Sequence, residues 1–224
     1  MINKKHIILI IIILIFGIIL SFYFKHQKVF VPQNYILPFS EKSVWKWKDD
    51  VTFSKCNENE QAISICLIEL IKKTGGSKDA LQAAEFLAKE KEDNPAYISS
   101  YRKEGLVGLV EVEYPYRANS TTGTLLIPAV GDHIIYVDDD INIDNIYKSS
   151  SITKEFALKN PNIDPYIPGM FIKSNHNDKF IELIFSYPLR NCHSCQDIAF
   201  IYITYQFTLE GAYIGKKISS ISYP

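Results

Sequence analysis

Hydrophobic residues dominate from Ile7 to Phe24, a stretch of 18 residues without a charge or a proline, in which 15 residues are Ile, Leu or Phe. An α-helix of that length measures about 27 Å, close to the hydrocarbon thickness of a bilayer. A buried core helix fits this stretch poorly, because it has no polar face at any angle. The pattern predicts one transmembrane helix.

Lys4 and Lys5 precede this stretch, and a cleaved signal peptide begins in the same way. The end of the stretch, Ser21-Phe22-Tyr23-Phe24, lacks the small-x-small pattern of a cleavage site, so we interpret the stretch as an uncleaved signal anchor. Lys25 and Lys28 balance the two earlier lysines, so the positive charges leave the orientation open. The short amino-terminal tail favours a cytoplasmic N-terminus. We expect a single-pass protein of the cell membrane, in a bacterium an inner-membrane protein with its C-terminal domain in the periplasm.

The spacing changes to that of amphipathic helices between Glu60 and Lys73, where apolar residues recur at Ile63, Cys66, Leu67 and Leu70. Gly75-Gly76 ends this helix, Ser77 caps a second one, and Asn94-Pro95 ends the second. A third short helix is expected over residues 96–103. Because Cys66 lies on the apolar stripe, we expect a buried free thiol there.

After Gly105 apolar residues alternate with polar ones, which indicates half-buried strands. The predicted strands cover residues 106–114, 124–127, 133–137, 180–187, 197–209 and 213–218, with a short helix over 153–158. Their expected core faces include Leu106, Val110 and Val112 in the first, Ile181, Leu183, Phe185 and Tyr187 in the fourth, and Ala199, Ile201, Ile203, Tyr205, Phe207 and Leu209 in the fifth.

Helices followed by antiparallel strands predict an α+β fold: an N-terminal transmembrane helix, then two or three helices packed on an antiparallel β-sheet. We divide the chain into a short cytoplasmic tail with the anchor (1–28), an irregular membrane-proximal segment (29–58) and an extracytoplasmic α+β domain (59–224). About 200 residues after the anchor suit a single core.

Composition excludes some classes of function. The chain has 24 basic and 25 acidic residues and a net charge of −1, so nothing in its charge favours nucleic acid. No phosphate loop, dinucleotide fingerprint or metalloprotease motif occurs, and the five histidines lack ligand spacing. We predict no catalytic residue, no cofactor and no metal ligand, although a hydrolase with an unrecognised site stays open.

The motif Cys192-His193-Ser194-Cys195 is the strongest chemical feature. A thioredoxin-type cysteine pair needs a helix N-terminus, which lowers the first thiol's pKa, but a strand-like segment follows here. Zinc would need two more ligands. We therefore interpret Cys192 and Cys195 as a structural disulfide, within the pair or to Cys56, with redox activity as the alternative.

Tyr114-Pro115-Tyr116-Arg117 and Tyr187-Pro188-Leu189-Arg190 both end predicted strands. Proline lacks the N–H that a strand ladder needs, so each strand is expected to stop there. If the two strands are parallel neighbours, Arg117 and Arg190 would form one anion or partner site, since arginine binds carboxylate or phosphate through two hydrogen bonds. The alternative is two unrelated strand ends with arginines over aromatic rings.

Asp138, Asp140, Asn142 and Asp144 alternate like calcium ligands, but Ile143 occupies the glycine position of an EF-hand. A solvated acidic turn is the expected structure, with a looser calcium site as the alternative. Altogether the sequence favours a non-catalytic envelope protein: a lipid bilayer contact through Ile7–Phe24 and a domain that binds a ligand or an envelope protein partner. The alternative is a thiol–disulfide redox protein using Cys192 and Cys195.

Overall fold

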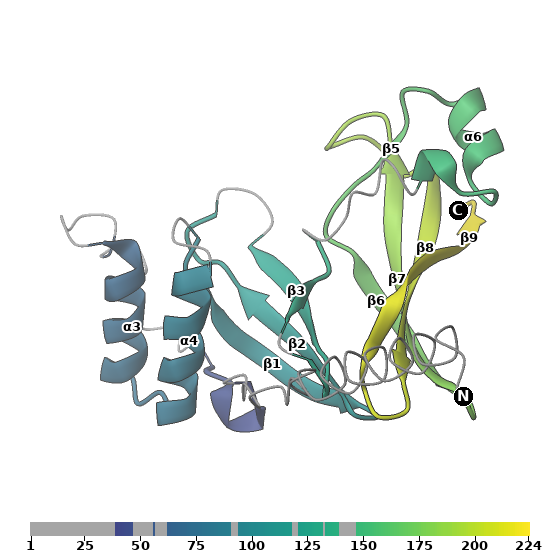
Figure 1. Ribbon diagram of the computed structural model, residues 1–224. Coiled ribbons are helices and arrows are strands. Elements are labelled where there is room, and N and C mark those ends of the chain that lie inside the picture. Colours follow the sequence, from purple (N-terminus) through teal and green to yellow (C-terminus); the bar gives the residue numbers. More distant parts are fainter. Residues whose placement is uncertain are drawn as a thin grey trace, which may run out of the picture. The chain divides into compact units, whose positions relative to one another are not determined.

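The computed structural model describes residues 39–46, 56, 62–90, 94–117, 121–131, 133–138 and 147–224. They belong to a compact unit, Ile36–Pro224, and the predicted anchor lies outside them. In this part of the chain the 3-10 helix η1 (Glu41–Ser43) and the helices α3 (Ile63–Lys73) and α4 (Lys78–Glu90) come first, and antiparallel strands follow (Figure 1). The predicted α+β class is confirmed. Within the described ranges, no helix has the length and apolar character needed to cross a bilayer.

The two predicted helices form, and Ser77 caps the second as expected. The Ser77 hydroxyl accepts a hydrogen bond from the Ala80 N–H over 2.9 Å and donates one to the Lys42 carbonyl over 2.6 Å, which attaches η1 to the start of α4. Trp45, just after η1, is buried, and its indole N–H donates to the Thr74 hydroxyl at the end of α3. The segment from Phe39 to Lys46 thus packs into the core beside the helices.

The expectation of a free thiol at Cys66 is wrong, because Cys66 forms a disulfide with Cys56. Leu67 and Ile71 make the fully buried contacts of α3, whereas Cys66 is half-buried on its flank. From this position on the helix the Cys66 sulfur reaches the buried Cys56.

The expected third helix over residues 96–103 is also wrong: this segment is strand β1 (Tyr97–Glu104). It pairs with β2 (Val107–Glu113) across the turn Gly105-Leu106, where Gly105 has a φ of 64° that glycine adopts without steric cost. Strand pairing across the hairpin overrides the local pattern. The sheet continues through β3 (Thr122–Ile127) to β4 (Ile135–Tyr136) in the order β1-β2-β3-β4.

A second antiparallel sheet follows helix α6 (Lys154–Lys159). It contains β5 (Asp164–Pro165), β7 (Phe180–Arg190), β8 (Ala199–Thr208) and β9 (Tyr213–Ser222) in that order, and β6 (Met170–His176), which the sequence pattern did not predict, also pairs with β7. The predicted core faces of β7 and β8 are buried from Ile181 to Tyr187 and from Ala199 to Phe207.

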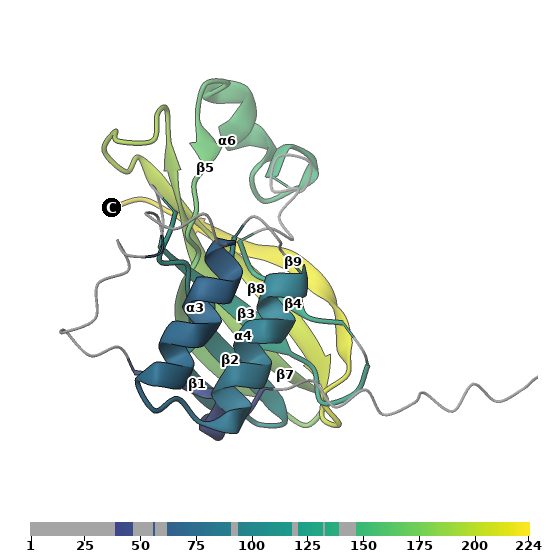
Figure 2. The same ribbon diagram turned by 90° about the vertical axis from the view of Figure 1, so that its left-hand side faces the viewer.

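The single predicted sheet is therefore two sheets, and the first lies between the helices and the second (Figures 1 and 2). Val110 and Val112 of β2 pack toward Ala83 and Leu87 of α4. Residues of the opposite phase, Val107 and Leu109, join the core of the second sheet, whose buried side chains include Leu183, Phe185, Tyr205 and Phe207. Both faces of β2 are buried along this part of the strand.

Two side chains assigned to core faces are exposed instead. Leu106 occupies the β1–β2 turn and Leu209 begins the β8–β9 turn, with 53% and 43% of their surface exposed. Each follows the alternation of its strand but lies beyond the last paired residue.

The sequence predicts that Pro188 ends β7 after Tyr187, but the strand continues to Arg190. The Pro188 carbonyl accepts the Tyr166 N–H on the β5 side over 2.9 Å. An antiparallel residue directs its N–H and its carbonyl to the same neighbour, so the missing N–H faces the short β5 strand and not β8. The residues after Tyr187 bring Arg190 to the loop between β7 and β8.

Candidate functional site: the disulfide-closed β7–β8 loop

The loop between Arg190 and Ala199 carries the Cys192–Cys195 disulfide. It connects β7 and β8, which pair in register from Phe180↔Thr208 to Leu189↔Ala199. The Ile198 N–H continues this ladder to the Leu189 carbonyl over 2.9 Å, and the Cys195 N–H donates to the Cys192 carbonyl over 3.2 Å as in a tight turn. A rigid hairpin thus presents the disulfide in a turn of four residues.

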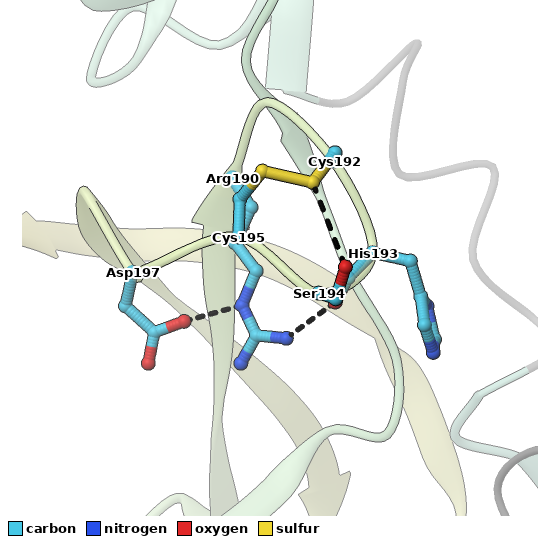
Figure 3. The surroundings of a disulfide bond; sticks show 6 residues. All are labelled: Arg190, Cys192, His193, Ser194, Cys195 and Asp197. Atoms are coloured by element: carbon cyan, nitrogen blue, oxygen red, sulfur yellow. Dashed lines mark hydrogen bonds and ion pairs between the residues drawn. A yellow bond between two sulfur atoms is a disulfide. The ribbon is translucent and has the colours of Figure 1, made fainter.

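Arg190 braces this loop from within (Figure 3). Its Nε donates to a carboxylate oxygen of Asp197, and its Nη1 donates to the His193 carbonyl over 3.0 Å. One acceptor, His193, lies between the two cysteines in the sequence, and the other, Asp197, follows the second cysteine. Arg190 is itself held in the sheet, where its backbone pairs with Asp164 of β5. The loop is therefore fixed by a covalent bond and by one guanidinium.

The surface of the loop is polar and accessible. His193, Ser194 and Gln196 are exposed, and the two cysteines are half-buried. The His193 ring points away from the disulfide (Figure 3) and lies edge-on to the Tyr166 ring, with 6.0 Å between centroids. None of these side chains belongs to a core cluster, so their positions serve the surface of the loop.

The chemistry available at the disulfide is limited. Residues 196–198 are irregular and β8 begins at Ala199, so no helix N-terminus faces Cys192. The dipole and free N–H groups that stabilise a thiolate in thioredoxin-type sites are therefore missing from this loop. Cys192 Sγ lies 4.0 Å from Ser194 Oγ. Across the described ranges, no three His, Cys, Asp or Glu residues are placed to hold a metal ion.

The structure does not bring Arg117 and Arg190 to one sheet edge. Their strands, β2 and β7, belong to different sheets, so the premise of neighbouring strands is wrong. Arg117 instead lies over the Tyr114 ring, 3.7 Å from its centroid, and donates from Nε to the Asn94 side-chain oxygen over 3.1 Å. Stacking on an aromatic ring was the alternative that the sequence left open, and it describes Arg117 well.

Arg117 also lines a small hollow at the end of the first sheet, together with Tyr114, Gly123, Thr124, Tyr136 and Asp138. Burial raises the pKa of Tyr136 to about 12, with smaller contributions from Glu90 and Tyr114. Burial also raises the pKa of Tyr114, against the lowering effect of Arg117. Both phenols therefore keep their protons at neutral pH. The Asp138 carboxylate accepts the Gly169 N–H over 2.8 Å, and the rest of the predicted acidic run, from residue 139 to 144, lies outside the described residues.

Comparison with known protein families, with curated proteins and with solved structures finds no match to this chain. The sequence pointed to Cys192 and Cys195, and their disulfide is present. It did not point to Asp197 or Tyr166, because the contacts of these residues depend on how the loop and β5 fold back on β7.

Proposed function

We propose that this protein is a single-pass membrane protein whose α+β domain lies outside the cytoplasm and binds a partner protein or ligand through the disulfide-closed β7–β8 loop. The domain acts by binding and not by catalysis. The observation that carries the proposal is an exposed loop that is fixed by a disulfide and by Arg190 while its outward side chains stay free of the core.

The anchor part of the proposal is supported by the sequence. Ile7–Phe24 has the length and composition of a transmembrane helix, and it follows a short basic tail. Two disulfides, Cys56–Cys66 and Cys192–Cys195, include all four cysteines of the chain. Disulfides persist in oxidising compartments and are rare in the cytosol, so an extracytoplasmic domain fits this pairing.

The binding part is supported by preorganisation. A loop that is already ordered loses little conformational entropy when a partner binds, so its contacts contribute more of their energy to affinity. Functional loops on rigid scaffolds commonly have this design. His193 and Ser194 supply hydrogen-bond donors and acceptors at the tip. We expect a polar partner surface that accepts hydrogen bonds from this turn.

Photo-crosslinking in cells tests the site directly. A photoreactive amino acid replaces His193 in the full-length chain, and a matched chain carries it at Lys73, whose side chain is 75% exposed at the end of α3. We expect a discrete adduct from position 193 that position 73 does not give. The same adducts from both positions, or none from position 193, would contradict binding through this loop.

A redox protein is the second candidate. The observation that favours it is the half-buried Cys192–Cys195 disulfide, whose cysteines are three positions apart in the sequence. In that case one thiolate of a partner's dithiol would attack one sulfur and form a mixed disulfide. The partner's second thiol would then break the mixed disulfide, which leaves Cys192 and Cys195 as thiols and the partner as a disulfide. Acid-quenched cells treated with a thiol-reactive probe separate the two functions. A fraction of protein with two reactive thiols supports exchange, and a fully oxidised, inert pair supports the binding module.

A further inference from the structure

Arg117 differs from the other two arginines of the chain in the partner of its guanidinium. Arg102 and Arg190 each pair through Nε with a nearby carboxylate. Arg117 donates from Nε to the side-chain oxygen of Asn94, a neutral amide, and no ion pair joins it to a carboxylate of the described residues. Its positive charge is therefore not neutralised by a direct partner within this part of the chain.

Three contacts hold the Arg117 guanidinium and its backbone in place. The guanidinium lies over the Tyr114 ring, 3.7 Å from the centroid, and its Nε is held by Asn94 over 3.1 Å. The Arg117 N–H donates to the Tyr114 carbonyl over 3.2 Å, which places the residue in a tight turn just after β2. With Nε occupied, Nη1 and Nη2 remain, and this pair of amino groups can bind both oxygens of a carboxylate. An ordered guanidinium also loses little conformational entropy when an anion binds.

A second donor lines the same small hollow as Arg117, the phenol of Tyr114. Tyr114 is only 4% exposed, and its hydroxyl has no hydrogen-bond partner among the described residues. A buried polar atom without a partner costs free energy, and a ligand in the hollow would remove that cost. Burial raises the pKa of Tyr114, so the hydroxyl has a proton to donate at neutral pH.

Gly123 keeps the hollow open beside this phenol. A Cβ added at Gly123 would lie 2.9 Å from the Tyr114 ring and 3.6 Å from its hydroxyl oxygen. Any other residue at position 123 would therefore crowd the space next to the hydroxyl. Because the hollow is small, it has room for one functional group and not for a whole molecule.

From these observations we infer that the hollow binds a carboxylate group, with the Nη1 and Nη2 groups of Arg117 on its oxygens and the Tyr114 hydroxyl as a third donor. Asp138 lines the same hollow, and its negative charge opposes a doubly charged phosphate more than a singly charged carboxylate. The carboxylate belongs to an acidic residue of a partner protein or to a small organic acid. The site uses Arg117 without Arg190, and it is independent of the binding proposed for the β7–β8 loop.

Nuclear magnetic resonance of the arginine side chains tests this site in the full-length chain, held in uncharged detergent micelles. The chain has three arginines, so three Nε–H signals are expected, and single Arg→Lys variants assign them. Sodium acetate is titrated against sodium chloride at constant ionic strength. We expect the Arg117 signal to shift and to saturate with acetate, while the signals of Arg102 and Arg190, which already pair with carboxylates, stay in place.

Two variants test the third donor. Tyr114→Phe keeps the ring under the guanidinium and removes the hydroxyl, so it should weaken acetate binding several-fold. The matched control is Tyr202→Phe on the second sheet, which should leave the acetate affinity unchanged. Unchanged Arg102 and Arg190 signals show that each variant is folded. Equal acetate affinity of Tyr114→Phe and the wild type would overturn the role of the hydroxyl.

Two acetylated hexapeptides, one of glutamate and one of glutamine, identify the source of the carboxylate. Tighter binding of the glutamate peptide than of acetate, at equal carboxylate concentration, supports a partner protein, and equal binding supports a small acid. Binding of the glutamine peptide, a shift of all three arginine signals alike, or no saturable shift of the Arg117 signal overturns the inference. Tighter binding of inorganic phosphate than of acetate overturns it as well.

Discussion

Arg190 and Asp197 form an ion pair across the base of the loop that carries the Cys192–Cys195 disulfide. The arginine ends one strand and the aspartate precedes the next, so the pair joins the two sides of the hairpin where the backbone ladder ends. The same guanidinium holds the His193 carbonyl. Two consequences for stability and for disulfide chemistry can be measured.

Replacing the arginine should loosen the loop without unfolding the domain. The side chains of Arg190 and Asp197 are 27% and 31% exposed, so water screens the ion pair in part. We expect Arg190→Ala to lower the free energy of unfolding by about 1 kcal/mol, since a charge-assisted contact and the His193 hydrogen bond are both lost. Denaturant titration measures this change. The Arg190→Ala substitution should also speed reduction of Cys192–Cys195 by dithiothreitol.

The matched control for this variant is Lys73→Ala. Lys73 forms an ion pair with Glu69 on the exposed surface of α3, 3.7 Å apart, and such pairs contribute little. Lys73→Ala should leave both the unfolding midpoint and the rate of Cys192–Cys195 reduction unchanged. An Arg190→Ala protein with wild-type stability and wild-type reduction kinetics would show that the guanidinium does not brace the loop.

The two disulfides should differ in their contribution to stability. Cys56–Cys66 spans ten residues and Cys192–Cys195 spans three. The chain-entropy relation then gives about 3 kcal/mol for the first and about 2 kcal/mol for the second, because a longer closed loop restricts the unfolded chain more. Paired Cys→Ser variants of each bridge, compared by urea unfolding, check the order. The reverse order would mean that native-state contacts outweigh loop closure.

The hydroxyl of Tyr147 should be dispensable. Tyr147 is fully buried, and its phenolic oxygen has no hydrogen-bond partner within the described residues. Because a buried unsatisfied polar atom costs free energy, Tyr147→Phe should keep or raise the stability, by up to about 2 kcal/mol. The matched variant is Tyr187→Phe, which removes a hydrogen bond to the Val137 carbonyl and should cost about 1 kcal/mol. Thermal unfolding should give a lower midpoint for Tyr187→Phe and an equal or higher midpoint for Tyr147→Phe, and a large loss in Tyr147→Phe would indicate a partner for its hydroxyl.

Alkaline pH should destabilise the domain through its buried tyrosines. Burial raises the pKa of Tyr136 to about 12 from the ordinary value of 10.0, and it raises the pKa of Tyr97 with help from the Glu113 carboxylate, which accepts the Tyr97 hydroxyl. A phenol that holds its proton more tightly when folded gives stability that is complete below pH 10 and lost as the pH rises through the folded value.

Unfolding in urea at several values between pH 9 and pH 12 measures this loss. Tyr136→Phe should have a shallower decline than the wild type, since one titrating group is removed. An identical decline in the variant would exclude Tyr136 as a source of the pH dependence.

Much of the fold could be predicted from local pattern. The alternation in β7 and β8 identifies their buried faces because each has a single core side, and Ser77 identifies the start of α4 because capping is local. The β1 strand could not be identified in this way. Its residues Arg102 and Lys103 suit a helix surface, and its strand conformation depends on pairing with β2 across Gly105.

The second sheet and the braced loop required three-dimensional information. Val107 and Leu109 belong to one core, while Val110 and Val112, of the opposite phase, belong to another. A strand with apolar residues at both phases does not reveal in the sequence which element covers each face. The Cys192-His193-Ser194-Cys195 motif is legible in the sequence, but the clamp from Arg190 is not. The repeated Tyr-Pro-x-Arg pattern suggested instead that Arg190 would meet Arg117, from which sheet topology separates it.

The central claim is that an anchor holds a disulfide-bonded domain outside the cytoplasm, and one labelling measurement tests it. Cells are quenched in acid, membranes are washed with alkaline carbonate, and full-length protein is treated with a maleimide polymer before and after reduction. We predict that the protein stays in the membrane pellet, unshifted on a gel before reduction and shifted by four additions after it, one for each cysteine. Protein in the carbonate supernatant, or protein that reacts fully without reductant, would contradict the account.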